Sequence, residues 1–105
     1  MSRWRRFEVM LPKQLNDGTP VPFGTIGRAV REITEQFGAS SFETQTIEGH
    51  WVHEGVEYRD DLVKIVVDVR DLAKNRQWMK GFKARWKMSL EQLEIWMVSY
   101  RIEIE

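Results

Sequence analysis

Two patterns of apolar residues alternate along this chain, and their order restricts the possible folds. Apolar and polar side chains alternate with a period of two over 5–11, 57–69 and 93–104, which is typical of β-strands, and the stretch 40–52 is rich in the strand-forming residues Thr, Phe, Ile and Trp. Apolar residues recur at helical spacing over 26–37 and again between Asp71 and Leu90. The order β-α-β-β-α-β predicts one α+β domain over residues 1–105. We expect a ferredoxin-like sandwich, in which two helices cover one face of a four-stranded antiparallel sheet.

Local signals support the boundaries of these elements. Gly38 stands where a glycine in the left-handed conformation would end the first helix. Gly55 supplies the positive φ that a tight turn between the second and third strands requires. Asp71 has the side chain of a good N-cap, and we expect it to begin the second helix.

The composition excludes several kinds of chemistry. The chain has no cysteine, so it cannot form disulfides, thiolate nucleophiles or zinc sites built on cysteine. It has no apolar run near the ~20 residues that span a bilayer, and no apolar segment follows its basic start. We therefore expect a cytoplasmic protein without a membrane partner. No motif indicates a cofactor, an activated nucleophile or a phosphate-binding loop, so a non-enzymatic protein is the favoured interpretation.

The face of the sheet that the helices leave open is the main candidate for function. By strict alternation we expect it to carry Arg6, Glu8 and Met10 of the first strand, Lys64, Val66 and Asp68 of the third, and Ile95, Met97, Ser99 and Arg101 of the fourth. Such a surface is too apolar to be fully solvated. It can serve a homodimer, a ligand or single-stranded nucleic acid, but the last use needs exposed aromatic residues, and the central strands offer only Trp4.

The favoured hypothesis is therefore a small module that forms a homodimer, through this face or through the last strand, or that binds a protein partner. Charged residues on it would then determine register and specificity. The predicted interface residues are Arg6, Met10, Val66, Ile95, Met97 and Arg101.

The charges suggest an alternative function. The formal net charge is zero, yet seven basic residues between Arg70 and Lys87 stand against one acid. Four of them follow the spacing i, i+4, i+7, i+11 and form one stripe of the second helix: Arg76, Lys80, Lys83 and Lys87. One interpretation is a nucleic-acid-binding accessory protein whose cations contact phosphates. The other is an ordinary solvated helix face, which the balanced overall charge favours.

The segment 49–61 gives a third hypothesis, a metal-dependent hydrolase. It contains both histidines, and His50 or His53 would act as base or ligand with Asp60 or Asp61 as the partner carboxylate. Residues three apart on a regular strand point to opposite faces, so the two histidines would converge only across a bulge. The simpler interpretation is a polar hairpin end in water.

The same segment carries a resemblance. The run Gly49-x-Trp51, followed by Gly55-x-x-Tyr58-x-Asp60, resembles a group of small uncharacterised bacterial proteins. The similarity extends to Asn16-Asp17-Gly18, Phe37-Gly38 and Gln92. It implies a ferredoxin-like domain and no activity, and a role as accessory subunit of a larger bacterial system is compatible with it. The motif also has a structural explanation, because the glycines shape a hairpin across which Trp51 and Tyr58 can pair.

Overall fold

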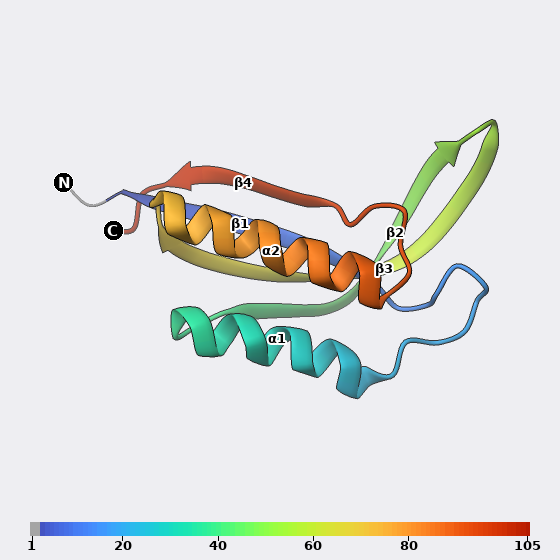
Figure 1. Ribbon diagram of the computed structural model, residues 1–105, viewed down its shortest axis with the longest axis horizontal. Coiled ribbons are helices and arrows are strands. Elements are labelled where there is room, and N and C mark those ends of the chain that lie inside the picture. Colours follow the sequence, from blue (N-terminus) through green and yellow to red (C-terminus); the bar gives the residue numbers. More distant parts are fainter. Residues whose placement is uncertain (1–2) are drawn as a thin grey trace.

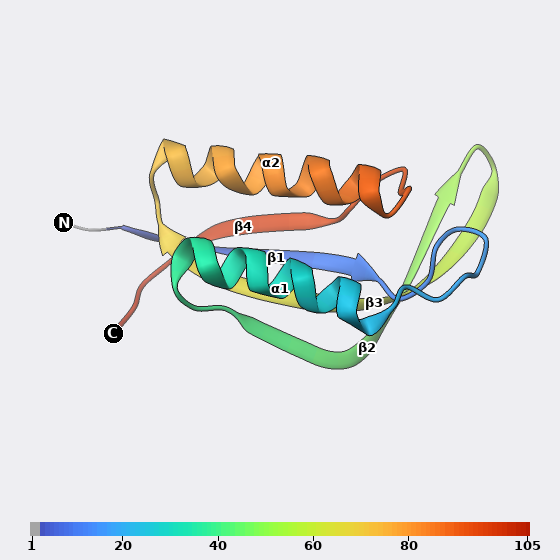
Figure 2. The same cartoon turned by 60° about the horizontal axis from the view of Figure 1, so that its bottom comes forward.

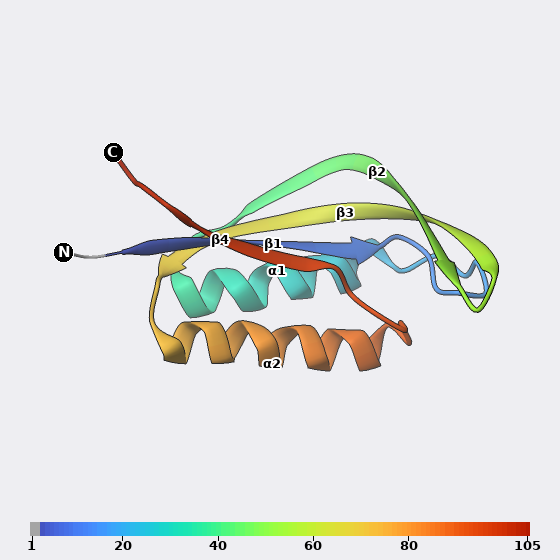
Figure 3. The ribbon, with the colours of Figure 1, turned by 90° about the horizontal axis from the view of Figure 1, so that it is seen from above.

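The computed structural model describes residues 3–105, which form a four-stranded antiparallel sheet with two helices on one face (Figures 1 and 3). The strand order is β2-β3-β1-β4, so the first strand lies inside the sheet between the third and the fourth. This arrangement confirms the ferredoxin-like α+β fold class. The elements are β1 (Trp4–Pro12), α1 (Phe23–Phe37), β2 (Ser41–His53), β3 (Val56–Arg70), α2 (Ala73–Ser89) and β4 (Met97–Ile102).

The core lies between the sheet and the two helices, which run side by side (Figure 2). Every second residue in the middle of β1 and β3 is apolar and faces the helices, as the period of two predicts. Taken as whole residues, the buried members of 3–105 are all apolar. Neither helix has the combined length and apolar character that crossing a bilayer requires. The core side chains at its centre are Val9, Leu11, Ile33, Ile65, Val67, Met79 and Phe82.

Two glycines allow the chain to reverse where the sequence predicts it. Gly38 follows α1 with a φ of 87°, and its N–H donates to the carbonyl of Thr34. Gly55 has a φ of 78° and Glu54 a φ of 52°, so both residues of the turn between β2 and β3 are left-handed. This pair of positive φ angles matches the twist of a two-residue hairpin turn. Both glycine predictions are confirmed.

β2 and β3 extend past the other strands and form a two-stranded projection, which we call the hairpin arm (residues 47–62). The pairing of β1 with β3 ends at Pro12 and Leu62, so the rest of the arm has no third strand. The arm projects from the end of the molecule opposite to the N- and C-terminal ends (Figure 1). It contributes to an elongated shape of 47 × 30 × 24 Å.

The prediction that Asp71 caps α2 is wrong. Leu72 occupies the N-cap position, and no side chain bonds to the helix start. The carboxylate of Asp71 instead accepts hydrogen bonds from Arg5 at 3.0 Å, from Arg76 and from Arg101 at 3.2 Å. The bonds from Arg5 and Arg76, that of Arg5 first, lower the pKa of Asp71. Since its side chain is only 3% exposed, Asp71 ties β1, α2 and β4 together at this end of the sheet.

Candidate functional site

The face of the sheet away from the helices is the first candidate site (Figure 3). Residues directly paired across antiparallel strands lie on the same face, so the register assigns each side chain. Trp96 precedes β4 and lies opposite Met10 of β1, because its carbonyl accepts the N–H of Met10 at 2.9 Å. We call this surface the open face, and its residues are Trp4, Arg6, Glu8 and Met10 of β1, Leu62, Lys64, Val66, Asp68 and Arg70 of β3, Ser41 and Glu43 of β2, and Trp96, Val98, Tyr100 and Ile102.

The face predicted for the fourth strand is wrong. β4 is shorter than 93–104, and its first residue, Met97, pairs with the fully buried Val9. The set that begins with Ile95 therefore lies on the helix-covered side. Ile95 is 1% exposed, Met97 packs against the core, and Arg101 binds Asp71. Both alternating sets of the strand contain apolar residues, so the pattern alone could not decide between them.

The open face thus receives half of the predicted interface residues. Arg6, Met10 and Val66 lie there as expected. The places expected for Ile95, Met97 and Arg101 are taken by residues with aromatic or β-branched side chains, in β4 and directly before it: Trp96, Val98 and Tyr100.

Charged side chains at the centre of the open face are bound to one another. Arg6 donates two hydrogen bonds to Asp68, at 2.7 and 3.0 Å. Lys64 donates to Glu8 at 3.2 Å and lies 3.7 Å from Glu43. At the end of the sheet, the guanidinium of Arg70 stacks 5.0 Å from the Trp4 ring. The charges of Arg6 and Lys64 are therefore paired with carboxylates of the same chain.

Tyr100 connects β4 to the same network. Its hydroxyl donates a hydrogen bond to the carboxylate of Glu8. This bond is the main reason that the pKa of Glu8 lies below its ordinary value, with Lys64 acting in the same direction. The same bond raises the pKa of the Tyr100 hydroxyl. The phenol is consequently held in place on the surface, although Tyr100 is 42% exposed.

The basic stripe of α2 is not a row of four free cations. Arg76 binds Asp71, and Lys83 lies 3.0 Å from Glu94. The latter contact lowers the pKa of Glu94. Two of the four residues are therefore engaged by carboxylates, which reduces the field that the stripe can present to phosphates.

The histidines of the hairpin arm do not converge. The arm pairs regularly from Ile47 to His53, so His50 and His53 lie on opposite faces, as a strand without a bulge predicts. His50 contacts Glu48 at 2.7 Å, and His53 lies 3.9 Å from Glu54. Within residues 3–105 no three His, Asp or Glu side chains are grouped as metal ligands would be. The geometry therefore gives the hydrolase hypothesis no support.

The motif of the arm forms a compact cluster instead. Trp51 and Tyr58 stack with ring centroids 4.4 Å apart and an angle of 18°, which confirms the predicted cross-strand pair. The indole N–H of Trp51 donates to Asp60 at 2.6 Å, and Asp60 is the strand partner of Gly49. A cavity of about 420 Å³ adjoins this cluster, and we call it the arm pocket. Its walls include Met10, Trp51, Asp60, Leu62, Glu94 and Trp96.

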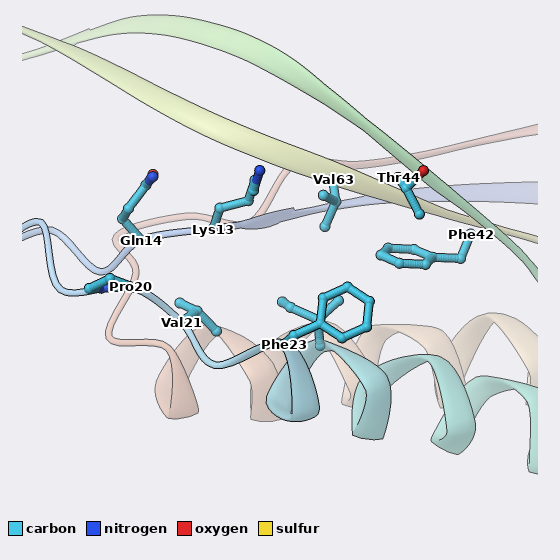
Figure 4. A pocket seen from close by; sticks show the side chains of 9 residues that line it. Lys13, Gln14, Pro20, Val21, Phe23, Phe42, Thr44 and Val63 are labelled. Carbon is cyan, nitrogen blue, oxygen red and sulfur yellow. The ribbon is translucent and has the colours of Figure 1, made fainter.

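A second cavity, of about 320 Å³, lies between β2 and the start of α1 (Figure 4). The rings of Phe23 and Phe42 meet there with centroids 6.3 Å apart. Lys13 is the charged residue of its lining, and its amine donates to Thr46 at 2.9 Å. Because the walls are otherwise mostly apolar, no set of polar groups converges on a ligand.

No protein-family model and no curated protein matches the chain. Solved structures of low sequence identity do share its fold. The divalent ion tolerance protein CutA1 from Ehrlichia chaffeensis superposes with a TM-score of 0.64 at 7% identity, over 100% of this chain and 86% of that one. CutA1 from Oryza sativa gives 0.66 at 12% identity, over 98% and 83%. A phage SAM lyase in complex with S-methyl-5′-thioadenosine gives 0.65 at 13% identity, over 99% and 91%. These similarities establish the fold alone, which agrees with the ferredoxin-like domain that the resemblance implies.

Proposed function

We propose that this protein is a non-enzymatic association module that assembles with further copies of itself through the open face. The observation that carries the proposal is that the charged side chains of this face are paired with one another. Arg6, Lys64 and Glu8 are all bound to partners on the same protomer, while apolar side chains between them remain uncovered. On a surface that faces water or binds a charged ligand, unpaired charges would interact more favourably with that water or ligand.

The size of the accessible surface supports a further contact. The chain exposes 7060 Å². A compact monomer of 12.5 kDa exposes about 6200 Å². The excess of roughly 900 Å² is similar to the ~800 Å² that one partner contributes to a standard interface.

A second copy of the chain suits the face better than a strongly charged partner. Its cations are Arg6, Lys64 and Arg70, and its carboxylates are Glu8, Glu43 and Asp68, so the two signs balance. A balanced face can meet its own copy across a two-fold axis without net repulsion. The aromatic anchors that such contacts favour are also present, since Trp96 is 64% exposed and Tyr100 is held by Glu8.

Light scattering after size exclusion tests this proposal. We expect the wild-type protein to elute with a multiple of its 12.5 kDa mass, independently of salt. Val66→Arg places an unpaired cation at the centre of the open face and should give a folded monomer. Val52→Arg changes a valine that is 70% exposed on the hairpin arm, outside the open face, and should leave the assembly intact.

Two outcomes would contradict the proposal. A wild-type monomer at high protein concentration would refute self-association, and an assembly unaffected by Val66→Arg would refute the open face as its site. Repeating the measurement with a mixed pool of short RNA and DNA tests the alternative. Binding that appears only at low salt and is lost when Lys80 and Lys87 are both changed to Glu would transfer the function to the stripe of α2.

A further inference from the structure

The arm pocket has walls of two kinds. Trp51 and Trp96 supply indole rings, whereas Asp60 and Glu94 supply carboxylates. Its volume of about 420 Å³ is within the range of sites for small molecules. Aromatic rings attract cations through the negative potential of their faces, and a nearby carboxylate adds to that attraction. The combination indicates an organic cation rather than an anion or a neutral ligand.

Asp60 is the carboxylate whose charge is not compensated. It is half-buried, and its hydrogen bond is to a neutral donor, the indole of Trp51. Across residues 3–105 it takes part in no ion pair, although its neighbour Asp61 lies 3.1 Å from Arg59. Glu94 differs, because Lys83 offsets its charge. A cation in the pocket would therefore be attracted chiefly by Asp60.

Gly49 lines the pocket beside that carboxylate. It is the strand partner of Asp60, so any side chain at position 49 would stand on the same face of the arm. A Cβ at this position would lie 3.0 Å from Cδ1 of Leu62, which is tighter than ordinary contact. The side chain of Leu62 therefore packs against Gly49, in the place where another residue would put its own side chain.

The site is also organised before any ligand arrives. The Trp51 ring is held by its stack on Tyr58 and by its bond to Asp60. Little side-chain freedom remains to be lost on binding, which favours affinity. Of the remaining lining residues, His50 and Gln92 are polar, whereas Met10, Pro12 and Leu62 are apolar and suit methyl groups better than the three N–H donors of a primary ammonium ion.

We propose that the arm pocket binds a small organic cation with a methylated ammonium head, of the size of choline. The head lies against the indoles of Trp51 and Trp96, and its charge is balanced by Asp60. This inference goes beyond self-association, although the pocket shares Met10, Leu62 and Trp96 with the open face.

Titration with choline, followed by NMR of the tryptophan indole N–H signals, tests the proposal. Choline should shift the signals of Trp51 and Trp96 and leave that of Trp86, which is buried in the core, unchanged. The matched ligand is 3,3-dimethylbutan-1-ol, which has the shape of choline without its charge. We expect it to bind at least about tenfold more weakly, because it lacks the attraction to the rings and to Asp60.

Two variants locate the charge that matters. Asp60→Asn keeps an oxygen that can accept the Trp51 N–H and should weaken choline binding about tenfold, with no effect on the neutral alcohol. Asp61→Asn removes the adjacent carboxylate, which points to the other face of β3, and should leave the affinity unchanged. Gly49→Val should weaken the binding of both ligands, because its side chain would displace Leu62, which lines the pocket.

Equal binding of the two ligands, or no change in Asp60→Asn, would overturn the proposal. The same titration on the monomeric Val66→Arg variant separates this inference from self-association. Binding by both proteins supports it, and binding by neither overturns it, whatever mass the wild-type protein has in solution. Binding by the monomer alone would overturn it for the assembled protein.

Discussion

The two faces of the sheet use the same strands in different ways. On the covered face β1 and β3 present apolar side chains such as Val9 and Ile65, and these are fully buried. On the open face the same strands present Arg6 and Lys64, whose charges are neutralised by neighbours on the sheet. The covered face is stabilised by packing against the helices. The open face is a surface with its charges already paired and its apolar residues still uncovered.

This difference indicates where stability and function reside. Burial of apolar area is the main source of folding free energy, whereas cross-strand pairs at a surface add little. Residues of the open face can therefore change without unfolding the protein, and residues of the covered face cannot. The predictions below test that division.

The largest effect is expected from a pair of adjacent residues on opposite faces. Ile65→Ala should lower the free energy of unfolding by about 2–5 kcal/mol, because Ile65 is fully buried between the sheet and the helices. Val66→Ala should cost less than about 1 kcal/mol in the dilute protein, because Val66 lies on the open face. Urea unfolding at low protein concentration measures both. Similar losses for the two variants would contradict the division between the faces.

An intermediate effect should come from Asp71, through pH. Its pKa in the folded protein lies below the ordinary 3.8, so the unfolded chain takes up the proton more readily. The stability that its ionised carboxylate provides is present above that ordinary value and is lost as pH falls through the folded pKa. Asp71→Asn lacks this contribution. Its urea midpoint should therefore lie well below that of the wild type at neutral pH and approach it as the pH falls through the folded pKa of Asp71.

The control for this experiment is Glu103→Gln, a change at an exposed position near the C-terminal end. It should follow the wild-type curve closely. A gap between wild type and Asp71→Asn that stayed constant with pH would show that the arginines around Asp71 do not depend on its charge.

The smallest effects concern Gly27, inside α1, and Gly38, which follows the end of α1. Gly38→Ala should destabilise the protein by about 1–2 kcal/mol, because alanine is strained at a φ of 87°. Gly27→Ala lies inside α1 with open space around the added methyl and should stabilise it by up to about 1 kcal/mol. Thermal unfolding measures the two shifts, and equal signs would contradict the assignment of Gly38 to the helix end.

The buried face of a strand can be predicted from the sequence when its two sets of alternating residues differ clearly in polarity. In β1 and β3 one set of alternating residues is apolar and the other contains Arg6, Glu8 or Lys64, so the buried side was evident. In the last strand Ile95 competes with Trp96, and only the pairing with β1 selects the buried set. Asp71 was misjudged for a related reason, since two of its arginine partners lie in distant strands.

In the candidate sites, too, features set by neighbouring residues were predictable and features set by the folded chain were not. The stack of Trp51 on Tyr58 was predictable, because a two-residue turn fixes which residues of a hairpin face each other. The pocket beside it was not, because its far wall comes from Glu94 and Trp96, which approach the arm only in the folded chain. Gly49 was the one local signal, since a glycine inside a strand often marks a place that a side chain would obstruct.

The position of β1 in the sheet has a consequence for synthesis of the protein. Its pairing with β4 joins Trp4 to Ile102. One edge of β1 therefore remains unpaired until almost the whole chain has been synthesised. On the ribosome β1 can already pair with β3, but its other side then presents free N–H and C=O groups to any extended segment nearby. A nascent chain of this protein should therefore benefit from chaperones that shield unpaired strands until translation of β4 is complete.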